Sequence, residues 1–139
     1  MEITANAIQT VAAGANVIFT DTVVCGNCSI MHREGSGLVT LRGLTNQCRA
    51  RFRVSFGGNI AIPTGGTVGP ISLAIAVNGE PVATTTMIST PAAVEEYNNV
   101  FSAIFLDVPK GCCSQISVRN TSDQPIEVQN ANLIIERVA

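Results

Sequence analysis

The sequence has little charge, few aromatic side chains and a single histidine. Charged residues make up 13% of its 139 residues, there is one tyrosine and no tryptophan, and the net charge is −2. Soluble domains usually carry about 25% charged residues, so we expect this chain to hide surface in an oligomer or a coat. Its weak acidic balance attracts neither nucleic acid nor an anionic membrane surface. We therefore expect neither as a partner.

Long apolar runs and catalytic signatures are also missing. No stretch reaches the ~18 apolar residues of a membrane-spanning helix, and no signal peptide begins the given chain. There is no G-x-S-x-G elbow, and the glycines of the 63–70 loop lack the Lys-Ser/Thr of a phosphate loop. The only histidine, His32, is expected to be exposed in a hairpin loop rather than part of a triad. Glu95, Glu96 and Asp21 form no acidic cluster that predicts a calcium site. We expect no enzyme, no cofactor and no metal.

What the sequence does contain is a run of strict alternation. From Arg49 to Phe56, apolar residues occupy every second position, and three arginines and a serine lie between them. A period of two is typical of a β-strand with two unlike faces. Two of the five phenylalanines, Phe52 and Phe56, are on the apolar side. This side is therefore predicted to face the core.

Other short segments rich in β-branched residues predict further strands. They cover residues 16–24, 29–32, 38–41, 71–77, 82–89, 99–108, 114–120 and 126–138. Asn78-Gly79 is a strong hairpin signal, and no segment has a helical apolar stripe. About nine or ten strands at ~8–12-residue spacing predict an all-β, antiparallel two-sheet jelly-roll sandwich. We expect one domain at 16–139, preceded by an N-terminal arm or edge strand at 1–15.

Four pieces of the sequence together resemble the C1q/TNF-like jelly-roll family. They are Ile71–Val77 with Asn78-Gly79, the phrase Phe105-Leu-Asp-Val-Pro-Lys-Gly111, the strand Gln115–Asn120, and the ending Val128–Ala139. The likeness is to the bacterial and phage branch, which includes the C-terminal domains of BclA-type spore-surface proteins. It implies a sandwich of about ten strands that forms a homotrimer, with residues 16–24, 49–56, 99–107 and 133–138 in the sheet facing the trimer. Unlike the spore proteins, this chain has no Gly-X-Y stalk.

The same resemblance gives the alternating strand a role. Arg51 and Arg53 would lie on the sheet that meets other subunits, and a buried arginine needs a partner. The last strand should lie beside this one, so Asp107 or Glu136 would pair with the arginines. We predict all four residues at a subunit interface. The alternative is a solvated strand face.

The five cysteines are Cys25 and Cys28 in a C-x-x-C, Cys48 alone, and the adjacent Cys112 and Cys113. The family topology places Cys48 near the last two, so the resemblance implies a disulfide from Cys48 to one of them. Cys25 and Cys28 would then close their own loop or bridge to the remaining cysteine. Free buried thiols are the alternative. Spacing argues against a four-cysteine metal site, and the missing βαβ pattern argues against a redox centre.

These expectations converge on a non-enzymatic structural subunit. It would be a homotrimer that decorates a phage virion or a bacterial surface assembly, in contact with a capsid or surface-layer protein. One alternative is a trimeric module that binds a glycan or receptor through the loops at 63–70 and 90–97. The other is a cysteine-based metal or redox protein.

Overall fold

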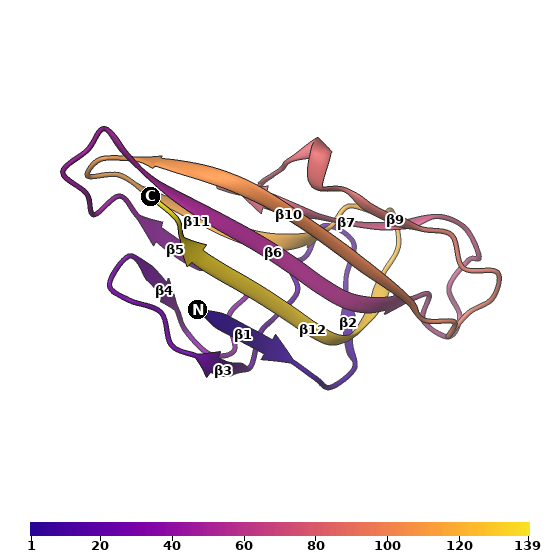
Figure 1. Ribbon diagram of the computed structural model, residues 1–139. Coiled ribbons are helices and arrows are strands. Elements are labelled where there is room, and N and C mark those ends of the chain that lie inside the picture. Colours follow the sequence, from indigo (N-terminus) through magenta and orange to yellow (C-terminus); the bar gives the residue numbers. More distant parts are fainter.

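The chain forms a sandwich of two antiparallel six-stranded sheets (Figure 1). A computed structural model describes all of residues 1–139. Sheet A contains β1 (Glu2–Ala5), β2 (Gln9–Val11), β3 (Asp21–Val24), β6 (Arg49–Ala61), β10 (Asn98–Pro109) and β12 (Ile126–Arg137). Sheet B contains β4 (Ile30–His32), β5 (Val39–Arg42), β7 (Ile71–Val77), β8 (Glu80–Pro81), β9 (Met87–Ser89) and β11 (Cys113–Asn120). The two-sheet, all-β prediction is confirmed.

Helix is almost absent. One 3-10 turn at Ala83–Thr85 is the single helical element. No helix of the structure has the length and apolar character needed to span a membrane.

Sheet A is organised around β6. The strand order is β10-β6-β12-β1-β3, and β2 pairs with β12 beside this path. β6 pairs with β10 from Arg49 opposite Pro109 to Ile60 opposite Asn98, without a register shift. Its other edge pairs with β12, with a bulge between Gln129 and Asn132. The strand predicted from alternation is therefore the longest of sheet A and lies between two partners.

The apolar side of β6 fills the middle of the sandwich. Ala50, Phe52, Val54 and Phe56 are all fully buried in a single core cluster. The Phe56 ring packs edge-on against Phe19, with ring centroids 6.3 Å apart. Burying such side chains contributes about 1.5–3 kcal/mol each. The core therefore sits where strict alternation predicted it.

Two predicted strands are broken up. Residues 82–89 form the 3-10 turn and the short strand β9, because the Thr85 hydroxyl donates to the Val82 carbonyl at 2.7 Å and accepts from the Ile75 amide at 3.0 Å. A threonine that bonds local backbone in this way competes with regular strand pairing. In the 16–24 segment only β3 is a strand of sheet A. Val17 instead donates its amide to the Val118 carbonyl of sheet B at 2.8 Å.

Residues 1–15, expected as an arm or edge strand, are part of sheet A. β1 lies between β12 and β3 and pairs with both, so it is not at an edge. The mild composition of this segment hid its role, because only Ile3, Ala5 and Val11 reach the core.

The connections gather at two opposite ends of the sandwich. The β3–β4 and β5–β6 connections and the β10–β11 turn lie at the left in Figure 1, near the C-terminal residue. The β6–β7, β9–β10 and β11–β12 connections lie at the right. At that right end, the Gln124 side chain accepts from the Thr67 amide at 3.0 Å and donates to the Thr67 carbonyl at 2.8 Å. The Glu95 carboxylate likewise accepts from Thr64.

Candidate functional site

The side of sheet A that points away from the core carries the predicted interface residues. We call it the outer face of sheet A. Phe105 lies opposite Arg53, and Asp107 lies opposite Arg51. On the other side of β6, Glu136 lies opposite Arg53. The face comprises Arg49, Arg51, Arg53, Phe101, Phe105, Asp107, Ile134 and Glu136.

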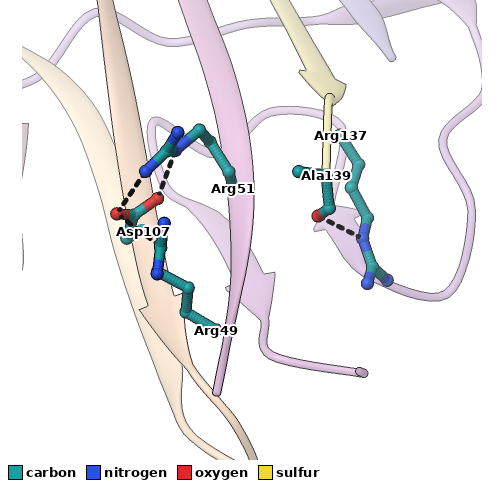
Figure 2. A network of polar contacts seen from close by, with 5 residues as sticks. All are labelled: Arg49, Arg51, Asp107, Arg137 and Ala139. Carbon is teal, nitrogen blue, oxygen red and sulfur yellow. Dashed lines mark hydrogen bonds and ion pairs between the residues drawn. The ribbon is translucent and has the colours of Figure 1, made fainter. Parts of the chain in front are cut away.

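Two arginines converge on one carboxylate at the end of this face (Figure 2). Arg51 donates from Nε to Asp107 Oδ1 at 2.8 Å and from Nη2 to Oδ2 at 3.1 Å. Arg49 Nε lies 3.0 Å from Asp107 Oδ2. The hydrogen bond from Arg51, aided by the charges of both arginines, lowers the pKa of Asp107 below its usual value. The carboxylate therefore stays charged at neutral pH and holds both guanidinium groups.

The second predicted pair is also present. Arg53 Nη1 lies 3.6 Å from Glu136 Oε1, and the two side chains are 50% and 53% exposed. The structure thus brings Arg51 to Asp107 and Arg53 to Glu136. In the single chain both pairs face solvent, and such exposed pairs contribute little to folding stability. These ion pairs instead fix the positions of the charged groups on the outer face of sheet A.

The apolar part of the outer face was not predicted from the sequence. Phe101 and Phe105 are 63% and 64% exposed, and Ile134 is 41% exposed. The Phe101 ring lies beside Gly57, which has no side chain to cover it. A signal was present in residues 99–108, where phenylalanine, alanine and isoleucine occupy both sides of the strand. In a two-sheet sandwich, only one side of each strand faces the core. A strand that is apolar on both sides therefore leaves apolar side chains on the face away from the core.

The cysteine predictions are wrong in two respects. All five cysteines are free, so no disulfide joins Cys48 to Cys112 or Cys113, or Cys25 to Cys28. All five are also exposed rather than buried. Cys48 and the turn cysteines are not direct cross-strand partners. The Cys48 carbonyl accepts from the Lys110 amide at 3.0 Å, and the Cys112 carbonyl accepts from the Gly43 amide at 2.9 Å. No group of three or more His, Cys, Asp or Glu side chains is placed to hold a metal ion.

His32 lies in β4 and is half-buried, not an exposed loop residue. Its Nε2 lies 2.9 Å from the Ser36 carbonyl, and its ring packs edge-on against Phe19 at 6.4 Å. A carbonyl can only accept, so Nε2 carries the proton. Its Nδ1 is buried and meets no polar partner. The ring therefore fills space against Phe19 and is not joined to any serine or cysteine hydroxyl or thiol.

A polar recess lies at the end of the sandwich that holds the β6–β7 and β11–β12 connections. It has a volume of about 420 Å³ and is lined by Thr67, Val68, Gly69, Pro70, Asp123 and Gln124. The Gln124 clamp on Thr67 fixes one wall. The predicted loop at 63–70 therefore forms a shaped surface together with the β11–β12 connection.

Comparison with known proteins identifies the fold. No protein-family model and no curated protein sequence matches the chain. Among solved structures, the Eiger TNF of S. frugiperda matches with a TM-score of 0.68 at 14% identity, covering 100% of this chain and 92% of that one. The globular domain of zebrafish complement 1qA matches with a TM-score of 0.63 at 12% identity, covering 96% and 93%. Murine APRIL matches with a TM-score of 0.57 at 11% identity, covering 95% and 96%. The chain has the C1q/TNF-like jelly-roll fold.

Proposed function

We propose that the protein is a non-enzymatic structural subunit that self-associates as a homotrimer through the outer face of sheet A. The observation that carries the proposal is the row of exposed apolar side chains on that face, Phe101, Phe105 and Ile134. Apolar side chains gathered on one face of a soluble protein mark an interaction surface. The shared fold with C1q and TNF proteins supports a second copy of this chain as the partner.

The charged residues of the face fit a contact between copies. A ring-forming contact joins two different patches, so residues on β10 of one copy meet other residues on the next. Arg49 and Arg51 share Asp107, and Arg53 pairs with Glu136, so each charged group on the face already has an ionic partner. A contact would therefore bury paired charges, which avoids the large cost of an isolated buried ion. Phenylalanine and arginine side chains would supply its binding energy.

The setting that we propose is the outside of a larger assembly, either a phage virion or a bacterial surface, with a capsid or surface-layer protein as the docking partner. Low charge supports this setting, since 13% charged residues leave much surface suited to contacts. The resemblance of the 105–111 and 128–139 segments to bacterial and phage jelly rolls points the same way.

Sedimentation of the purified chain at micromolar concentration tests the trimer. We expect one species of three times the chain mass that persists on dilution and in moderate salt, because the contact is largely apolar. A monomer under these conditions would contradict the proposal. Electron microscopy of particles mixed with the protein tests decoration.

The polar recess supports a second candidate, a glycan- or receptor-binding trimer. Asp123, Gln124 and Thr67 line this recess, and their side chains carry a carboxylate, an amide and a hydroxyl. Such groups hydrogen-bond to sugar hydroxyls. We expect glycan-array binding to be lost when Asp123 is replaced by alanine, while the oligomer is retained. An array without hits counts against this candidate and leaves the trimer untouched.

A further inference from the structure

All five cysteines lie at one end of the sandwich, although they are spread over nearly ninety positions of sequence, from 25 to 113. The β3–β4 connection carries Cys25 and Cys28, the β5–β6 connection carries Cys48, and the β10–β11 turn carries Cys112 with Cys113 beside it at the start of β11 (Figure 1). None of the connections at the other end has a cysteine. The fold therefore concentrates the thiols in one region.

Backbone contacts join this region into one surface, which we call the cysteine end. Lys110 donates its amide to the Cys48 carbonyl at 3.0 Å. Cys113 lies opposite Arg42 in the sheet, and the Arg42 guanidinium contacts the Cys28 carbonyl at 3.5 Å. The three cysteine-bearing segments are thus neighbours in space.

Exposure is the unusual property of these cysteines. Free cysteine is among the residues most often buried in proteins, yet all five are exposed here. The core accordingly does not explain their presence. Their number is odd, so pairing within one chain always leaves at least one thiol free to bond to another molecule.

Cys48 adjoins the outer face of sheet A. Together with Gln47, Arg49, Arg51 and Ala139 it lines a recess of about 210 Å³. Arg49 and Arg51 are the residues that hold Asp107 on that face. A copy that covers the outer face would therefore bring its own surface close to the Cys48 thiol.

We propose that Cys48 forms a disulfide with Cys112 or Cys113 of the neighbouring copy, so that the trimer becomes covalently closed in an oxidising environment. The inference rests on the proposed self-association through the outer face. A ring contact pairs unlike patches, so the partner that we assign to Cys48 on the neighbouring copy is a cysteine of a different segment, the β10–β11 turn. The β10–β11 turn is the tip of edge strand β10, which carries Phe101 and Phe105.

A disulfide oxidant such as oxidised glutathione completes the chemistry. The Cys48 thiolate attacks one sulfur of oxidised glutathione, which releases one reduced glutathione and leaves a mixed disulfide. The turn cysteine of the neighbour then attacks the Cys48 sulfur and releases the second reduced glutathione. One sulfur–sulfur bond is broken and one is formed, and the two thiol protons end on the two glutathione thiols.

The test is oxidation of the assembled protein at micromolar concentration with oxidised glutathione, followed by denaturing electrophoresis without reductant. We expect covalent dimers and trimers that a thiol reductant returns to single chains. Cys48→Ser should abolish them. The matched control, Cys25→Ser with Cys28→Ser, removes two exposed thiols from the same end and should leave them unchanged.

Three results would overturn the inference: no covalent multimer, multimers that persist in Cys48→Ser, or only a bond within one chain, seen as loss of two hydrogens in the intact mass. Sedimentation of the reduced protein separates this failure from failure of the proposed function. A reduced trimer that does not cross-link contradicts the disulfide alone. A reduced monomer contradicts the trimer itself and the disulfide that depends on it.

Discussion

Replacing Phe101 and Phe105 together by serine should separate the subunits without weakening the fold. A buried phenylalanine covers ~200 Å², and these two are 63% and 64% exposed in the single chain. Each therefore leaves ~130 Å² for a neighbour to cover. At ~25 cal/mol per Å², that is about 3 kcal/mol per ring. If only half of the total of ~6 kcal/mol is realised, association still weakens by roughly a hundredfold.

Sedimentation over a dilution series measures the effect, and chemical denaturation of the diluted protein measures the fold. We expect the double variant to dissociate at concentrations where the unaltered chain stays assembled. Its free energy of unfolding as a monomer should change by less than about 1 kcal/mol, because both side chains lie outside the core.

The matched control is Ile88→Ser on β9 of sheet B. Ile88 is 68% exposed, so an equally open apolar side chain is removed from the other sheet. We expect the control to assemble normally. Equal dissociation of both variants, or of neither, would refute the assignment of the contact to the outer face of sheet A.

Three further predictions concern the fold. Asn120→Ala should destabilise the protein by about 3 kcal/mol in a denaturant titration, because the fully buried amide donates to three backbone carbonyls that would lose their donor. Gly43→Ala should cost about 1–3 kcal/mol in the same assay, since an added methyl would overlap the Pro109 carbonyl; an unchanged midpoint would contradict that packing. Burial, and then the 2.6 Å hydrogen bond to Glu127, raises the pKa of Tyr97 to about 12. Stability should therefore fall as pH rises above the ordinary tyrosine pKa of about 10. Near-ultraviolet absorbance follows this one tyrosine directly, and Glu127→Gln should lower its pKa.

The sequence predicted the sheets well because their strongest elements obey a local rule. β6 alternates strictly over residues 49–56, and β7 ends in an Asn78-Gly79 hairpin. The ion pairs of the outer face followed from the strand order that the family resemblance implied, and Asp107 and Glu136 are indeed cross-strand neighbours of the arginines. Alternation placed the arginines on one side of the strand, and the resemblance placed their partners beside them.

Features that depend on distant contacts were not predicted. β1 is a short, mild segment whose place in the sheet depends on pairing with β12, at the far end of the chain, as well as with the nearer β3. Cysteine spacing carries no information on whether two sulfurs meet, and strand neighbours are not always disulfide partners. The exposed phenylalanines were overlooked because aromatic residues in a strand ordinarily indicate core.

The position of β12 has a consequence for how the molecule is made. β12 is the last of the strands to leave the ribosome, yet it lies between β6 and β1 in sheet A. Until it arrives, one edge each of β6 and β1 lacks its pairing partner, and unpaired edges invite aggregation. Joining such distant segments makes folding slow, in the range of about milliseconds to seconds. A ribosome that stalls before residue 126 would thus hold a fragment prone to aggregation, and chaperone demand should be greatest until β12 has emerged.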